Sequence, residues 1–239
     1  LAPMLQKVLP SVVNIRAQIK ITDINTLAKL QRTQRGEVPD KFLSVGSGVI
    51  VNADKGYILT NAHVVADAER VIVTLSDGRH YTAKIIGADK PSDVALLQIQ
   101  AKNLTPITIG NSNDLKVGDF VAAIGNPFGL SQSVSSGIVS ALGRSTLGIE
   151  NYENFIQIDA SINPGNSGGA LVDTQGKLIG INTAILAPDR GSIGIGFVIR
   201  SNMAESVMQQ LIEYGNVRRG AFGIGAQDIT LELATEFGI

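Results

Sequence analysis

The sequence predicts an all-β protein made of two six-stranded barrels, followed by one C-terminal helix. Glycine is abundant, with 26 residues in 239, aromatic residues make up only 5%, and β-branched residues gather in short runs. Turn signals such as Asp77-Gly78 and Gln175-Gly176 separate many of these runs. Short strands at close, regular spacing favour a barrel or sandwich over a βαβ fold. About a dozen strands divide into two barrels of six, with a cleft between them.

The expected strands follow one another in two sets. The first set comprises Val12–Arg16, Gly48–Asn52, Gly56–Thr60, Val71–Leu75, Tyr81–Ile86 and Asp93–Ile99. The second set comprises Phe120–Ile124, Ser133–Ser140, Phe155–Ile158, Ala170–Val172, Leu178–Asn182 and Ile195–Ile199.

A helix is expected after the last strand, and a shorter helical turn after His63. Ser201 can cap the start of the long helix and Gly215 ends it. Its apolar stripe, assigned to core packing, consists of Val207, Met208, Leu211 and Ile212. Two polar segments, Lys20–Lys41 and Leu142–Asn154, resist strand assignment and are expected to be long loops. Such loops are either solvated surface or segments with a gating, assembly or regulatory role.

The stretch Asn163–Gly169 (Asn-Pro-Gly-Asn-Ser-Gly-Gly) places Ser167 among glycines. A serine hydroxyl attacks a carbonyl only if its oxygen stands clear of the backbone and backbone N–H groups face the oxyanion that forms. Glycines permit the dihedral angles and the close approach that this arrangement needs. An ordinary hairpin loop has a similar composition, so the prediction of a nucleophile depends on a base and an orienting acid elsewhere.

The chain offers two histidines as a general base. His63 follows the apolar strand that ends at Thr60, where side chains can converge on a cleft. His80 lies in a segment that alternates polar and apolar residues, so it is expected to be an ordinary surface residue. Asp93 opens an apolar run and can orient an imidazole, although an Asp at a strand start is also a common turn former. The order His63, Asp93, Ser167 is one of the orders in which catalytic triads occur.

Gly165-x-Ser167-x-Gly169 also matches the nucleophile elbow of another hydrolase fold. That fold needs a helix directly after the serine and a histidine downstream of it. Here the residues after Ser167 are typical of strand, turn and strand, and no histidine follows. The interpretation of this stretch as the nucleophile elbow of an esterase is therefore rejected.

Composition limits the remaining function classes. The net charge is −1 and no basic tail is present, so nucleic acid is not an expected partner. No apolar run reaches the roughly 18–20 residues that span a bilayer, so no integral membrane segment is expected. Cysteine is absent, which excludes disulfides and zinc–thiolate sites, and neither a metal nor a cofactor is expected. The N-terminus lacks a charged-then-apolar signal, which indicates a cytosolic or already processed chain.

Taken together, these residues resemble the HtrA (Deg) family of serine proteases. The matching blocks are Gly46–Ile50, Leu59–Val65, Ser92–Leu97, Gly125–Gly129, Ile156–Ala160 and Asn163–Ala170. The resemblance implies a chymotrypsin-like double β-barrel over residues 1–217, with residues 218–239 as the beginning of a PDZ domain. It also implies a periplasmic mature chain after signal removal, homo-oligomers built from trimers, and unfolded envelope proteins as substrates.

The expected reaction is peptide hydrolysis through an acyl-enzyme. Ser167 attacks the carbonyl, His63 moves the proton, and Asp93 fixes the imidazole tautomer. The N–H groups of Gly165 and Ser167 form the oxyanion hole, with Asn166 setting the turn between them.

The pocket for the residue before the scissile bond (P1) is expected to be small and apolar. Trypsin-like enzymes that select Lys or Arg carry an Asp six residues before the nucleophile. Ser161 stands at that position here, next to Ile162, and the opposite wall comes from Ile195 and Phe197. We therefore expect Val, Ala or a similar aliphatic residue at P1.

Two further expectations come from the resemblance. Arg219–Ile224 resembles the loop that captures a peptide carboxylate in a PDZ domain, through Gly220, Phe222, Gly223 and Ile224. The alternative function is a chaperone or holdase whose triad is dormant at rest. Family members switch between such states through loops matching Lys20–Lys41, Leu142–Asn154 and Thr183–Gly194.

Overall fold

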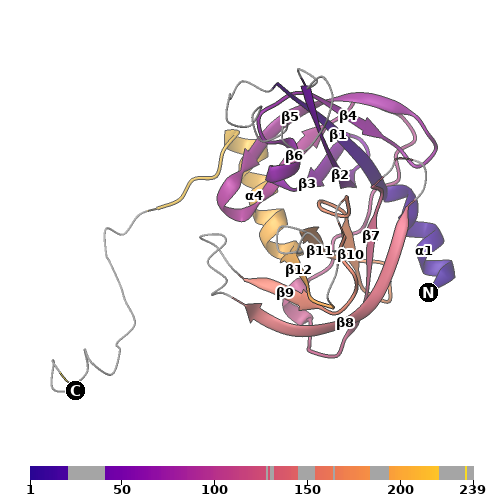
Figure 1. Ribbon diagram of the computed structural model, residues 1–239, viewed down its shortest axis with the longest axis vertical. Helices are drawn as coiled ribbons and strands as arrows, with labels where there is room; N and C mark the ends of the chain where they lie inside the picture. The colour runs from indigo at the N-terminus through magenta and orange to yellow at the C-terminus, as the bar shows by residue number, and fades with distance from the viewer. Residues whose placement is uncertain are drawn as a thin grey trace, which may run out of the picture.

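Two closed barrels of six antiparallel strands form the main body of the residues that the structure describes (Figure 1). The computed structural model describes residues 1–20, 41–127, 129, 132–144, 154–163, 165–183, 194–220 and 235. The strand order is β1-β2-β3-β6-β5-β4 in the first barrel and β10-β11-β12-β9-β8-β7 in the second. The predicted fold class, all-β with two six-stranded barrels and a C-terminal helix, is confirmed.

The elements have the following bounds. The first barrel contains β1 (Val12–Lys20), β2 (Lys41–Asn52), β3 (Tyr57–Thr60), β4 (Ala68–Thr74), β5 (His80–Asp89) and β6 (Val94–Gln98). The second contains β7 (Phe120–Gly125), β8 (Ser133–Arg144), β9 (Phe155–Ile158), β10 (Ala170–Val172), β11 (Leu178–Thr183) and β12 (Gly196–Arg200). Among the described residues the helices are α1 (Ala2–Val8), α3 (Ala62–Val65) and α4 (Ser201–Tyr214), with 3₁₀ turns η1 (Leu9–Ser11), η2 (Lys90–Ser92) and η3 (Ser112–Asp114).

Apolar residues on both faces of the strands divide the core into three clusters. Along β6, Ala95 and Leu97 pack inside the first barrel, whereas Val94 and Leu96 belong to a cluster that both barrels share. Successive strand side chains point to opposite faces, so an unbroken apolar run can serve both clusters. The third cluster fills the second barrel. Helix α4 lies along the two barrels and buries Val207, Met208 and Leu211 in the shared cluster (Figure 1).

The C-terminal helix starts differently from its prediction. Its N-cap is Arg200, and Ser201 is the first helical residue, because the Ser201 hydroxyl donates to the carbonyl of Gly110 at 2.8 Å instead of capping the helix. The helix end is as predicted, since Gly215 adopts the left-handed conformation with φ 72°. His63 lies within the short helix α3 rather than before it.

Several strands are longer than predicted, and α1 was not predicted. Lys20 and Lys41 pair across β1 and β2, so both ends of the loop expected at Lys20–Lys41 are strand residues. Similarly, β8 continues to Arg144, beyond the point where the second loop was expected to begin. Residues 21–40 and 145–153 lie outside the described residues.

Candidate active site

His63 and Asp93 form a hydrogen-bonded pair at the edge of the first barrel. Nδ1 of His63 lies 2.8 Å from Oδ2 and 3.0 Å from Oδ1 of Asp93, and the His63 backbone N–H donates to Oδ1 at 2.9 Å. The Asp93 side chain is 4% exposed and that of His63 is 37% exposed. Because a carboxylate only accepts hydrogen bonds, the proton of the neutral imidazole belongs on Nδ1. Nε2 is then the acceptor that a general base requires.

The backbone around Asp93 fixes the position of this pair. Asp93 has a φ of 53°, a left-handed conformation that Asp tolerates better than most residues. Its N–H donates to the carbonyl of Lys90 at 3.1 Å, which closes η2. Its carbonyl accepts from the N–H of Ala62 at 3.1 Å and from Nδ2 of Asn61 at 3.1 Å. The acid and the helix that carries the histidine are therefore joined through backbone as well as side chains.

Asp89 stabilises the turn that leads to Asp93. Its carboxylate accepts from the N–H of Ser92 at 3.0 Å and from the Ser92 hydroxyl. Arg219, which follows α4, donates two further bonds to this carboxylate at 2.6 and 2.5 Å. Burial by itself would raise the pKa of Asp89, but the hydrogen bonds from Arg219 and Ser92 outweigh burial and lower the pKa.

Replacing Asp89 by Asn is expected to lower the free energy of unfolding at neutral pH by about 1.5–3 kcal/mol, the range for a hydrogen bond to a charged group. Because the folded-state pKa of Asp89 is depressed, this contribution is complete above the unfolded-state pKa of about 4. It is lost as the pH falls through the folded-state value. Thermal melts at several pH values should show the full difference in Tm between the native protein and Asp89→Asn at pH 7 and pH 5.5. Below pH 4 this difference in Tm should become smaller.

The matched control for this prediction is Asp77→Asn. Asp77 pairs with Arg79 at 2.8 Å, but both side chains of this pair are exposed. Exposed ion pairs contribute little, so the Asp77 variant should shift Tm much less than the Asp89 variant. A difference for Asp89→Asn that stays constant down to pH 3 would contradict the assignment of its stabilising effect to the ionised carboxylate.

Ser167 lies in the turn before β10, packed against the first barrel. Its carbonyl accepts from the N–H of Ser47 at 2.8 Å, and the residue is 5% exposed. The next residue, Gly168, has a φ of 82°, and a Cβ there would collide with the Ser47 carbonyl and the Thr60 hydroxyl. Only glycine fits such a close approach. Since Thr60 ends β3 just before α3, the serine turn is placed beside the helix that carries His63.

Gly165 and Asn166 form the turn that leads into Ser167. Gly165 has a φ of 92°, and a Cβ there would collide with Pro127. The N–H of Asn166 donates to the carbonyl of Asn163 at 3.0 Å, and its side-chain oxygen accepts from the Ser133 hydroxyl at 3.1 Å. Pro164 lies outside the described residues.

The four residues expected to form the substrate pocket differ in exposure. Ile162 is 1% exposed and packs in the core of the second barrel. Phe197 is 8% exposed and meets Phe155 edge-on, with ring centroids 6.0 Å apart. Ser161 is exposed and Ile195 is 45% exposed. Ile162 and Phe197 are thus mainly core residues, whereas Ser161 and Ile195 are exposed to solvent.

The remaining candidate residues lie away from this site or outside the described residues. His80 is exposed and contacts the Thr74 hydroxyl at 3.0 Å, as expected of a surface residue. Of the expected carboxylate loop, Gly220 is described, whereas Phe222, Gly223 and Ile224 are not. Among the described residues, no group of three or more His, Asp or Glu side chains is arranged to hold a metal ion.

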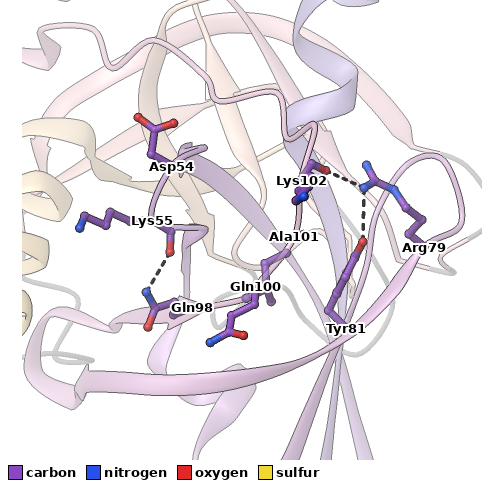
Figure 2. A pocket seen from close by; sticks show the side chains of 9 residues that line it. Asp54, Lys55, Arg79, Tyr81, Gln98, Gln100, Ala101 and Lys102 are labelled. Atoms are coloured by element: carbon purple, nitrogen blue, oxygen red, sulfur yellow. Dashed lines mark hydrogen bonds between the residues drawn. The ribbon is translucent and has the colours of Figure 1, made fainter.

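A cavity of about 620 Å³ on the first barrel lies apart from these residues (Figure 2). It is lined by Asp54, Lys55, Arg79, Tyr81, Gln98, Ile99, Gln100, Ala101 and Lys102. The Arg79 guanidinium donates to the Tyr81 hydroxyl at 3.3 Å and to the Lys102 carbonyl at 2.6 Å, and it also pairs with Asp77. The Arg79 guanidinium is therefore already bound to neighbouring residues of the same barrel. The lining holds no paired nucleophile and base, so the candidate chemistry is at His63, Asp93 and Ser167.

Comparison with known proteins assigns the chain to a peptidase family. Residues 46–181 match a family model described as a trypsin-like peptidase domain. Over 245 residues the chain is 53% identical to the periplasmic pH-dependent serine endoprotease DegQ of Escherichia coli K12, covering 100% of this chain and 54% of DegQ. It is 52% identical over 264 residues to the periplasmic serine endoprotease DegP of the same organism, covering 98% of this chain and 56% of DegP. The chain thus spans about half the length of the curated relatives it matches.

Solved structures of HtrA-type proteases also resemble this chain. The HtrA-type protease AlgW with a tripeptide superposes with a TM-score of 0.85 at 46% identity, covering 100% of this chain and 72% of that one. The serine endoprotease from Yersinia pestis superposes with a TM-score of 0.72 at 42% identity, covering 94% of this chain and 71% of that one. In the part of the chain that the structure describes, no helix is both long and apolar enough to cross a bilayer.

Proposed function

Because this chain belongs to the HtrA-type branch of the trypsin-like peptidases, we propose that it is a serine endopeptidase that degrades unfolded or misfolded proteins of the bacterial envelope. The observation that carries the proposal is the hydrogen bond between His63 and the buried carboxylate of Asp93, with the Ser167 turn packed beside the helix that carries His63. A periplasmic location is supported by relatives that are themselves named periplasmic endoproteases.

The proposed mechanism uses each member of the triad in turn. Ser167 Oγ attacks the scissile carbonyl while Nε2 of His63 takes its proton, and Asp93 stabilises the imidazolium that forms. The N–H groups of Gly165 and Ser167 stabilise the oxyanion of the tetrahedral intermediate, with Asn166 forming the turn between them. The imidazolium then protonates the leaving amine, which leaves an acyl-enzyme. Water attacks this ester with His63 again as base, and the carboxylic acid product departs with Ser167 restored.

We further propose residues 1–217 as the protease domain and residues 218–239 as the start of a PDZ domain. Helix α4 ends at Tyr214 and packs against the core cluster that both barrels share, which supports a domain boundary just beyond this helix. For assembly, we propose trimers or multiples of trimers. For regulation, we propose that the segments after β1, β8 and β11 control the activity.

Cleavage after small aliphatic residues is the expected specificity. Digestion of an unfolded casein substrate, with mass spectrometric mapping of the products, should place most cuts after Val or Ala. Peptides that differ only at P1 should show kcat/KM at least about 10–200-fold higher for Val than for Lys, the range that a misfit of one methylene controls in an apolar pocket. The reason is that Ser161, accessible at the pocket, carries no charge to pair with a basic P1 residue.

Ser161→Asp is the matched variant for this test. A carboxylate at this position should raise cleavage after Lys relative to cleavage after Val, because it adds a partner for the ammonium group. A native enzyme that already cuts mainly after Lys or Arg would contradict the proposed pocket. Rapid cutting of the casein with no preference at P1 would contradict it as well.

A further inference from the structure

Ser47, on β2 of the first barrel, connects the two barrels at the proposed active site. The residue is 0% exposed. Its hydroxyl donates to the carbonyl of Gly165 at 2.7 Å and accepts from the backbone N–H of Asn126 at 2.7 Å. Both partners belong to the second barrel, so a single hydroxyl from the first barrel uses its proton and one lone pair across the interface.

The backbone of Ser47 makes two more contacts around the same point. Its N–H donates to the carbonyl of Ser167 at 2.8 Å, and its carbonyl accepts from the Thr60 hydroxyl at 2.7 Å. Ser47 therefore contacts Gly165, the proposed nucleophile Ser167, and the end of the strand that leads to His63.

Asn126 is itself held in place, which fixes the direction of the Ser47 hydroxyl. The Asn126 carbonyl accepts from Nδ2 of Asn14 at 2.7 Å, and its side-chain oxygen accepts from the N–H of Gly129 at 3.0 Å. Because Asn126 is 1% exposed and its N–H points at Ser47 Oγ, the hydroxyl proton is left for Gly165. Among the described residues Asn14 Oδ1 has no hydrogen-bond partner, so the restraint runs from Asn14 Nδ2 through Asn126 to Ser47 and Gly165.

The peptide that Ser47 holds needs an external restraint. Gly165 has a φ of 92° and no Cβ, so its own sterics allow the neighbouring peptides to rotate. The carbonyl bonded to Ser47 belongs to the peptide between Gly165 and Asn166. Fixing that carbonyl restricts ψ of Gly165, and with it the direction of the Gly165 N–H.

We propose that Ser47 is a positioning residue for the oxyanion hole, whose hydroxyl holds the Gly165 turn and whose N–H holds Ser167. This role rests on the proposed function of Ser167, and it acts through Gly165 without touching the substrate. An oxyanion donor is used in the transition state rather than in substrate binding, so its misplacement lowers kcat more than it raises KM.

Ser47→Ala is the first test, with a peptide substrate that has Val at P1. We expect kcat to fall by about 10–100-fold, less than the 10²–10³ lost when a donor is deleted outright, with KM changed less than about 3-fold. Affinity for a peptide boronate, which forms a tetrahedral adduct with the serine, should fall in proportion to kcat. Ser47→Cys, close in size but a weaker donor, should give an intermediate loss, and it decides the question if the alanine variant does not fold.

Ser112→Ala is the matched control for the loss of a buried hydroxyl. Ser112 is also 0% exposed, and its hydroxyl makes two bonds to Asn202, one to the backbone N–H and one to the side-chain oxygen, away from the triad. It should lower Tm while leaving kcat and boronate affinity unchanged. A merely structural role for Ser47 would give the same pattern in the Ser47 variants and would overturn the proposal.

The same assays separate this proposal from the proposed function. If Ser167→Ala abolishes turnover but Ser47→Ala keeps kcat and boronate affinity within 2-fold, the positioning role is wrong and the protease assignment stands. If turnover does not depend on Ser167, both are wrong. Loss of kcat and boronate affinity in Ser47→Ala, with substrate KM and Tm close to those of Ser112→Ala, supports the positioning role.

Discussion

Ser167→Ala is expected to reduce kcat for peptide hydrolysis by roughly 10⁶-fold, the order of the loss found in subtilisin when the serine or histidine of the triad is removed. The physical reason is that the proposed acyl-enzyme forms on the Ser167 hydroxyl, and alanine offers no nucleophile in its place. His63→Ala should produce a loss of the same order. The double variant should be no worse than either single variant, because the two residues act as one unit.

A fluorophosphonate probe with mass spectrometry provides the direct measurement. The intact chain should be labelled at Ser167 alone, and Ser167→Ala should remain unlabelled with its Tm nearly unchanged. Degradation of unfolded casein should disappear with the labelling. Labelling at a different serine would contradict the assigned nucleophile. An unlabelled intact chain that still suppresses aggregation would instead favour the alternative of a chaperone whose triad is dormant at rest.

Local patterns were sufficient to predict the two barrels and the three candidate catalytic residues. The run Val94–Leu97 predicts a buried strand because every residue in it is apolar, and the structure shows both faces in use. Asp93 was predicted because it is a single acid at the start of that run. The edges of the elements were predicted less well. Ser201 was expected to cap α4, but its hydroxyl bonds to Gly110, which lies 91 residues away in the sequence.

The residues that support the triad were not predicted, because their partners are distant in the sequence. Ser47 was recognised only as part of a glycine-rich block, and its hydroxyl contacts Gly165, 118 residues later. Asp89 and Arg219 are 130 residues apart. Arg219 was assigned by resemblance to the start of a carboxylate-binding loop, whereas its guanidinium is bound to Asp89 beside the turn that leads to Asp93. A single sequence contains no signal for such tertiary hydrogen bonds.

Asp93→Asn is expected to lower kcat by about 10⁴-fold, as the equivalent substitution does in trypsin, while the fold is retained. The amide oxygen can still accept the backbone N–H of His63, which lies 2.9 Å from Oδ1. The amide nitrogen, however, is a donor, and facing Nδ1 of His63 it requires that atom to be an acceptor. The imidazole proton then moves to Nε2, where the base must be free to take the proton of Ser167.

Nitrogen NMR of the histidine rings distinguishes this account from general disruption of the site. In the native protein the neutral form of His63 should carry its proton on Nδ1, and in Asp93→Asn on Nε2, with Tm nearly unchanged. Asp173→Asn is the control, because Asp173 also accepts backbone N–H groups, those of Gln175 and Lys177 at 2.8 and 2.9 Å, but lies outside the triad. A variant at Asp93 that keeps the Nδ1–H tautomer and still loses activity would show that the carboxylate charge, rather than tautomer selection, accounts for the loss.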